Sequence, residues 1–241
     1  MMPDRTGETF GSEAKRLAAL DWHAVANELD SEGYAVLKDV LRPSEVRAFG
    51  RMMGDEGQLG ELAELGLGRG RYRAFHAPLP ATLPLWRRAL HMTLLPLANQ
   101  WEALLGSGIT HSHPETAGHE GMEGNAIAAL TRLGSGDFYA LHQDSRTGPS
   151  FPFQAALLLS EPGDFSGGEL VMTEQRPRMQ SRPMVVPVQP GDIAILAAVH
   201  RPHRGAKGYY RVNLKHGVSR VRSGERLGME LLLGANGNLP P

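Results

Sequence analysis

The second half of the chain consists of short strand-like segments separated by glycine- and proline-bearing turns. Eight such segments occur, at residues 126–133, 138–144, 153–160, 168–173, 184–188, 192–198, 209–216 and 226–233. Short strands at this spacing are typical of a closed or double-sheet β architecture, which leaves few strand edges unpaired. The sequence therefore predicts a mainly β core over residues 125–233.

The first half carries helical patterns instead. Trp22, Val25 and Leu29 lie on one helical face, with Asp21 as a plausible N-cap and Gly33 just past the end. The other expected elements are a loose tail at 1–11, a strand at 34–37, a helix from a Ser44 cap to about Met53, a strand near 69–75 and a long helix at about 84–105.

A chain of 241 residues suits one domain with a full-sized core, so we expect a single domain spanning residues 1–241. Residues 1–124 would form a mostly helical support and a loop, packed against the β core. The net charge of −1 and the pI of about 6.8 argue against a nucleic-acid backbone as the main partner. A local basic stripe could still be hidden in this balance.

The chain has no cysteine, which excludes disulfides, thiolate metal ligands and cysteine nucleophiles. No apolar stretch approaches the length needed to cross a bilayer, and the first residues lack the apolar region of a secretory signal. We therefore expect a cytoplasmic protein with no membrane partner, and the oligomeric state is left open.

His142 and Asp144 lie two residues apart at the end of a predicted strand. Side chains two apart point to the same face, so this pair presents an imidazole and a carboxylate to one point. A second histidine would complete a 2-His-1-carboxylate site, which leaves three positions open on a non-haem Fe(II). His216 is the best candidate, and Arg226 follows it ten residues later.

Two other histidines, His200 and His203, compete with His216 for this role. Pro202 lies between them and is expected to interrupt strand geometry. Neither histidine is followed by an arginine at the ten-residue spacing seen after His216. His216 is therefore preferred, with His200 and His203 kept as alternatives.

The chain contains four collinear blocks, at residues 142–144, 158–169, 173–182 and 210–226, with weaker ones at 68–72 and 34–37. Together they resemble the Fe(II)/2-oxoglutarate-dependent dioxygenases, and more narrowly a bacterial group of prolyl-hydroxylase-like oxygenases. The resemblance implies a double-stranded β-helix (jelly roll, cupin-like) flanked by N-terminal helices. It also implies Fe(II) held by His142, Asp144 and His216, with Arg226 pairing with the distal carboxylate of 2-oxoglutarate.

The function implied by the resemblance is oxidation of a substrate C–H bond, with 2-oxoglutarate and O2 as cosubstrates and release of succinate and CO2. The charge balance favours a small polar metabolite, such as an amino acid, a peptide or a natural-product intermediate, as the substrate that is hydroxylated. The alternatives are oxidative dealkylation of damaged nucleic acid and a non-catalytic sensor that binds 2-oxoglutarate.

Several cations are candidates for contacts to the substrate. Arg146, just beyond the metal-binding motif, and Arg73 are the expected substrate contacts. Arg176, Arg178 and Arg182 cluster in a loop that either recognises an anionic substrate or is simply solvated.

A polar, glycine-rich loop carries three further histidines, His111, His113 and His119. They show no fixed spacing to an acidic partner, and a structural zinc site would normally include cysteines as well. We therefore expect this loop to be a mobile lid over the iron rather than a second metal site.

Overall fold

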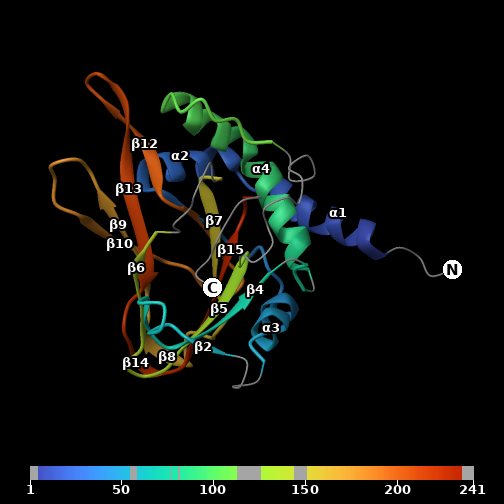
Figure 1. Cartoon of the computed structure of the whole chain (residues 1–241). Helices are drawn as coiled ribbons and strands as arrows, with labels where there is room; N and C mark the ends of the chain where they lie inside the picture. Colours follow the sequence, from blue (N-terminus) through green and yellow to red (C-terminus); the bar gives the residue numbers. More distant parts are fainter. Residues whose placement is uncertain are drawn as a thin grey trace.

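The computed structural model describes residues 5–54, 59–76, 78–80, 82–112, 126–143 and 151–234. Two β-sheets face each other, and helices cover the outer side of the larger sheet (Figure 1). The strand pairs within the sheets are antiparallel. This architecture confirms the predicted double-stranded β-helix.

The larger sheet has seven strands in the order β1-β11-β7-β15-β5-β4-β2. Their bounds are β1 Tyr34–Leu37, β11 Ile193–Ala197, β7 Phe153–Leu158, β15 Arg226–Leu232, β5 Ala128–Leu133, β4 Arg71–Phe75 and β2 Gly60–Glu61. β15 lies in the middle, because Gly228 pairs with Leu158 on one side and with Thr131 on the other. This central strand is buried along nearly its whole length.

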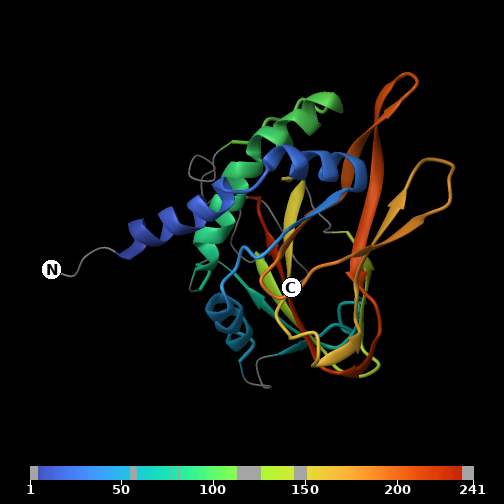
Figure 2. The same ribbon diagram turned by 180° about the vertical axis from the view of Figure 1, so that it is seen from behind.

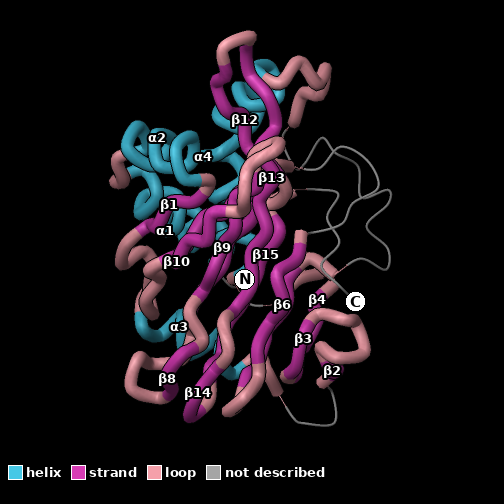
Figure 3. The backbone as a smooth tube through the Cα atoms, turned by 90° about the vertical axis from the view of Figure 1, so that its left-hand side faces the viewer, coloured by secondary structure: helices cyan, strands magenta, loops and turns pink. Residues whose placement is uncertain are grey.

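The smaller sheet has the order β10-β9-β13-β6-β3, and β12 pairs with β13. Their bounds are β10 Arg182–Val186, β9 Leu170–Gln175, β13 Gly208–Val218, β6 Phe138–His142, β3 Gly68–Arg69 and β12 His200–Gly205. A separate two-stranded sheet joins β14 Val221–Gly224 to β8 Phe165–Gly167. No described helix lies over the outer face of the smaller sheet, as the side view shows (Figure 3).

Four helices make the outer layer: α1 Arg5–Ala18, α2 Trp22–Glu32, α3 Pro43–Arg51 and α4 Leu83–Leu104. Seen from behind, they lie on the side of the larger sheet away from the smaller one (Figure 2). α2 begins as predicted, because the Asp21 carboxylate accepts hydrogen bonds from the backbone amides of His23 and Ala24. It ends at Gly33, whose φ of 79° is in the left-handed region that favours glycine.

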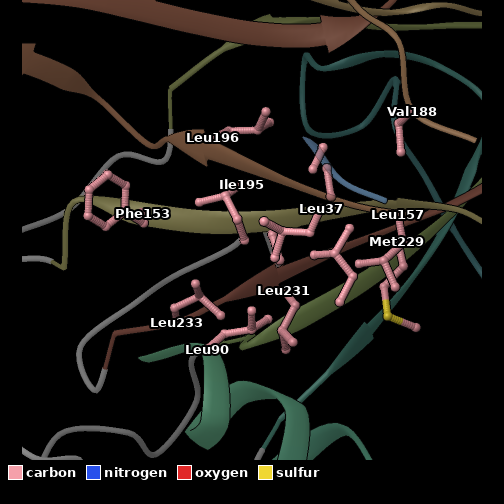
Figure 4. Close-up of a cluster of buried hydrophobic side chains, with 14 of the residues drawn as sticks. Leu37, Leu90, Phe153, Leu157, Val188, Ile195, Leu196, Met229, Leu231 and Leu233 are labelled. Atoms are coloured by element: carbon pink, nitrogen blue, oxygen red, sulfur yellow. The ribbon is translucent and has the colours of Figure 1, made fainter. Parts of the chain in front are cut away.

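The main core lies between the larger sheet and these helices. Alternate residues of β15, among them Met229 and Leu231, point toward the helical layer, where Leu90 of α4 lies beside Leu231 and Leu233 (Figure 4). Each fully buried leucine of this kind contributes about 1.5–3 kcal/mol relative to exposure. This apolar layer fixes one face of β15, so the other face is free to carry polar groups into the space between the sheets.

Two expectations for the N-terminal half were wrong. The predicted loose tail forms α1 from Arg5 onward, and its Arg16 contacts Glu45 at 2.7 Å and lies over the Trp86 ring. α3 does not use Ser44 as its cap. It begins at Pro43, and the backbone amide of Arg42 donates to the Glu45 carboxylate at 2.8 Å. A contact with the distant Glu45 thus stabilises the last turn of α1, while a local contact within residues 42–45 stabilises the start of α3.

All eight predicted strand segments contain a strand, and the structure adds β12, which had been excluded because of Pro202. Pro202 lies inside β12, opposite Arg211 of β13. β12 pairs with β13 alone among the described strands, so a residue without an N–H is tolerated there. Among the described helices, none combines the length and the apolar character required to cross a bilayer.

Candidate metal centre

Three buried side chains meet in the space between the two sheets. His142 comes from the end of β6, His216 from β13 and Glu230 from β15. The Nε2 atom of His216 is 3.3 Å from one oxygen of Glu230, and the Nε2 atom of His142 is 3.8 Å from the other. The two imidazole ring centroids are 4.3 Å apart. Both sheets therefore contribute side chains to a single point.

The smaller sheet positions its two histidines by register. His216 pairs directly with His142 across β13 and β6. Along β13, Val212, Leu214 and His216 are buried while the residues between them are exposed, as the strand alternation predicted. The histidine thus continues a row of apolar residues that point into the interior.

The hydrogen bonding of His142 indicates which of its nitrogens faces the centre. Its Nδ1 atom is 2.9 Å from the carbonyl oxygen of Ala140. A carbonyl can only accept, so Nδ1 carries the hydrogen, and in the neutral ring the lone pair is on Nε2. Nε2 therefore faces Glu230 and, when it carries no hydrogen, is the atom available to a metal ion.

The spacing of the three groups fits one metal ion. Imidazole nitrogens and carboxylate oxygens bind a divalent ion at about 2.1 Å, so neighbouring ligands at a right angle are about 3 Å apart. The observed separations of 3.3 and 3.8 Å need only a small contraction to reach this geometry. Two imidazoles and one carboxylate with open positions suit non-haem Fe(II).

The charges at the centre are set by burial and by mutual contact. Burial alone would raise the pKa of Glu230, but the facing rings of His216 and His142 outweigh it and hold that pKa well below its usual range. Glu230 is therefore a carboxylate at neutral pH. Burial lowers the pKa of Arg226 to about 10, with Glu230 opposing the shift, so Arg226 keeps its positive charge.

Arg226 lies on the same face of β15 as Glu230, because residues 226, 228 and 230 alternate with those that point to the helices. Its side chain is almost fully buried, at 3% exposure. A Cβ atom on Gly228 would be 2.5 Å from an Nη atom of Arg226. The guanidinium thus lies directly over Gly228, on the strand face that leads to Glu230.

A cavity of about 300 Å³ adjoins Arg226. Its walls include the apolar side chains of Phe165, Leu170 and Val186, and its polar residues are Arg226, Ser166, Glu169 and Gln189. A buried guanidinium at the edge of a cavity is suited to hold a carboxylate, because its planar fork can donate two parallel hydrogen bonds.

Sequence reasoning missed both Glu230 and Gln154. Gln154 is fully buried on β7, and its amide nitrogen is 2.7 Å from Nε2 of His216. Gln154 is the single polar residue of the apolar strand Phe153–Leu158, and Glu230 lies among apolar residues of Arg226–Leu232, where Arg226 is the other polar side chain. Such an isolated polar residue in a buried strand is the signal that could have identified them, because burial without a partner is costly.

The remaining residues predicted for the site, Asp144, Arg146 and Arg73, are not seen beside His142 and His216 in the part of the chain that the structure describes. Asp144 and Arg146 lie outside the described residues. Arg73 does not join the group: it shares the helical face of the larger sheet with its partner Leu130, and it donates to the backbone carbonyls of Met52 and Met53. Its described contacts therefore hold the end of α3 rather than a substrate.

The competing histidines do not reach the centre. His200 pairs with Asn213, whose side chain points away from His216, and burial lowers its pKa. His203 instead contacts the ring of Tyr210, with ring centroids 5.3 Å apart. His216 is thus the histidine that meets His142.

Of the three loop histidines, only His111 is described. Its backbone amide donates to the side chain of Asn99, and its ring is 3.3 Å from Glu102. These contacts attach it to α4. His113 and His119 lie outside the described residues, so the expected lid stays a prediction.

Comparison with known proteins places the chain among oxygenases. A family model described as an oxygenase catalysing oxidative methylation of damaged DNA matches residues 70–235. An uncharacterised protein of Mycobacterium tuberculosis strain H37Rv is 34% identical over 165 residues, which are 66% of this chain and 70% of the relative. Its counterpart in strain CDC 1551 / Oshkosh matches to the same extent.

Solved structures share the fold at low sequence identity. A prolyl 4-hydroxylase of Phytophthora capsici has a TM-score of 0.55 at 16% identity, covering 98% of this chain and 67% of that one. A Pseudomonas putida prolyl-4-hydroxylase has a TM-score of 0.52 at 18% identity, covering 87% and 96%. The fold and the buried His–His–Glu group together fit Fe(II), 2-oxoglutarate and O2.

Proposed function

The chain belongs to this oxygenase family, and from that premise we propose that it is an Fe(II)- and 2-oxoglutarate-dependent dioxygenase that acts on damaged nucleic acid. The observation that carries the proposal is the buried group of His142, His216 and Glu230 inside the double-stranded β-helix. Arg226, on the same strand face as Glu230, supports a place for an anionic cosubstrate. The family's description supports damaged DNA as the first substrate class to test.

His142, Asp144 and His216 are the proposed iron ligands, and Arg226 is the proposed partner of the distal carboxylate of 2-oxoglutarate. When bound, Fe(II) and 2-oxoglutarate would supply the electrons that activate O2, which is the oxidant. The chain holds and orients them. The planar guanidinium of Arg226 can bind a carboxylate through two parallel hydrogen bonds, and its burial keeps water from competing.

Glu230 is a second carboxylate at the proposed iron site. Its two oxygens lie 3.8 Å from Nε2 of His142 and 3.3 Å from Nε2 of His216. Asp144 keeps the ligand role because it belongs to the motif that carries the family resemblance. Glu230 then adds negative charge beside the ion and holds both rings in place.

A small polar metabolite is the second candidate substrate class, because the whole chain is close to neutral. Succinate release separates the candidates when it is measured with a methylated oligonucleotide and with a panel of amino acids and peptides. Release with the oligonucleotide alone supports nucleic acid, and release with a metabolite alone contradicts it. Stoichiometric 2-oxoglutarate binding without succinate release in either case would indicate a sensor.

We expect anaerobic addition of Fe(II) and then 2-oxoglutarate to give a visible charge-transfer band in the wild type. Asp144→Ala is expected to lose the band, because a ligand is missing. Glu230→Gln is expected to keep it, with binding weakened about tenfold, since it removes a charge and not a ligand. The opposite result for the two variants would make Glu230 the ligand, and a folded wild type without a band would contradict the iron proposal.

Gly228→Ala should weaken 2-oxoglutarate binding without altering any proposed ligand. The added methyl would lie 2.5 Å from an Nη atom of Arg226 and so displace the guanidinium. We expect about tenfold more 2-oxoglutarate to be needed for half-maximal formation of the band, corresponding to one weakened charge-assisted contact.

Gly163→Ala is the matched control for this variant. Nothing lies within 4 Å of its added methyl, so its 2-oxoglutarate titration should match that of the wild type. An unchanged titration in Gly228→Ala would mean that Arg226 does not bind the cosubstrate.

A further inference from the structure

Positive charge is concentrated in one part of this nearly neutral chain. Residues 165–222 contain ten arginines and lysines against three aspartates and glutamates, while the whole chain carries a net charge of −1. This segment includes the β9–β10 and β12–β13 hairpins. The charge balance of the whole chain therefore hides a basic surface.

The two hairpins project from the sheets on the side away from α1 and α3 (Figures 1 and 2). Gly205 pairs with Gly208 at the end of the β12–β13 hairpin, where the chain turns back. Arg182 pairs with Glu174 at the end of the β9–β10 hairpin. We call these two projections, residues 170–186 and 200–218, the basic hairpins.

Some of these cations have a structural role. Arg201 is buried and contacts Glu174 at 2.5 Å, and Arg176 contacts the same carboxylate at 2.6 Å. Arg182 contacts Glu32 at 2.7 Å. These three guanidinium groups share two carboxylates within the fold, so they are engaged in internal ion pairs.

The other hairpin cations are exposed: Arg178, Arg204, Lys207, Arg211 and Lys215. Among the residues that the structure describes, none of the five has a carboxylate within ion-pair distance. An apolar or aromatic side chain lies beside them near each hairpin end, Met179 at 59% exposure and Tyr209 at 43%. Each projection thus joins uncompensated positive charge to an exposed contact for a base.

We propose that the basic hairpins bind the phosphate backbone of the nucleic-acid substrate, with Tyr209 and Met179 contacting bases. The proposal rests on the proposed function, because it assumes that the substrate is nucleic acid. Exposed arginines and lysines give such binding most of its strength, and flat or flexible side chains stack on unpaired bases. An enzyme that oxidises a base must also hold the strand from which that base is turned out.

The length of β13 relates this surface to the metal centre. Lys207 precedes His216 by nine residues, which corresponds to about 30 Å along an extended strand. That distance spans about nine base-pair steps at 3.4 Å each. The β12–β13 hairpin thus carries exposed cations at its tip, and its strand β13 carries a proposed iron ligand near its root.

The test measures binding of a labelled DNA duplex by fluorescence anisotropy over a range of salt concentrations. The variant Arg204→Gln/Lys207→Gln/Arg211→Gln removes three charges from one hairpin. If each cation meets a phosphate, the slope of log affinity against log salt should fall in magnitude by about 2–3, at about 0.9 per contact. Affinity at low salt should fall about tenfold or more, while the anaerobic 2-oxoglutarate band stays unchanged.

The matched control is Lys15→Gln/Arg47→Gln/Arg51→Gln, which removes the same charge from exposed positions of α1 and α3. It should bind DNA with the wild-type slope. An equal loss in both triple variants would mean that only net charge matters, and no loss in the hairpin variant would remove the hairpins from the interface. If the wild-type protein does not bind DNA but releases succinate with a small metabolite, the hairpin proposal is wrong. The proposal that the protein is a 2-oxoglutarate-dependent oxygenase would still stand.

Discussion

His216→Ala will abolish Fe(II) binding at micromolar metal while the protein stays folded. The imidazole is one of two in the centre, and its Nε2 atom is 3.3 Å from Glu230. Loss of a side chain that merely orients a ligand weakens metal binding 10–100-fold, so loss of a ligand itself should cost more than about 100-fold. Anaerobic Fe(II) titration, followed by the 2-oxoglutarate band, measures the effect.

His200→Ala is the matched control, since His200 is the nearest competitor in the sequence and lies away from the centre. It should bind Fe(II) as the wild type does. A His216→Gln variant replaces most of the buried volume, so that a loss of binding cannot be ascribed to a cavity. Metal binding that survives in His216→Ala but is lost in His200→Ala would reverse the assignment.

Glu174→Gln will destabilise the fold by about 3–5 kcal/mol, because it breaks a buried ion pair and leaves a cation without its partner. Arg201 is 1% exposed, and its guanidinium also donates to the backbone carbonyl of Asp30 at 2.7 Å. This contact fixes the root of the β12–β13 hairpin against α2. Urea denaturation of the wild type and the variant gives the free energy of unfolding.

The same pair predicts the pH dependence of stability. Burial opposes ionisation of Glu174, but hydrogen bonds from Arg201 and Arg176 outweigh it and lower its pKa below the usual 4.5. A lowered folded-state pKa contributes stability above that usual value, and the contribution is lost as pH falls through the folded-state pKa. The stability of Glu174→Gln should therefore vary less below pH 4.5 than that of the wild type.

Two further variants control for nonspecific effects. Glu161→Gln removes an exposed carboxylate and should change the free energy of unfolding by less than about 0.5 kcal/mol. The double variant Glu174→Leu/Arg201→Met removes both charges and should recover much of the lost stability. Equal destabilisation by Glu161→Gln would mean that burial of the pair is unimportant.

Local patterns in the sequence were sufficient for much of the fold. The turn-separated strands, the Asp21 cap and the stop at Gly33 each have a signature within a few neighbouring residues, and each is present. The start of α1 was not predicted, because Gly7 and Gly11 lower the helix propensity of this segment. Contacts with distant residues, such as that of Arg16 with Glu45, offset this low propensity. β12 was not predicted, because Pro202 is tolerated only where a strand lies at the edge of its sheet, and the order of strands in a sheet cannot be read from one segment.

The residues of the candidate metal centre were predictable only where they belong to a sequence motif. The spacing of His216 and Arg226 identified both residues, and the structure places them in the interior near Glu230. The polar side chain of Glu230 in a buried strand could have marked it as unusual, but its meeting with the histidines could not be predicted, because that depends on how two sheets face each other. No pattern within a single strand contains that information.

The uneven placement of charge has a consequence for how the molecule approaches other charged bodies. Because residues 165–222 are strongly basic and the chain as a whole is slightly acidic, the rest of the chain must carry a negative excess. The protein therefore has a large electric dipole whose positive end includes the basic hairpins. A polyanion would turn the molecule before contact, so that the hairpins arrive first and the helical side faces away.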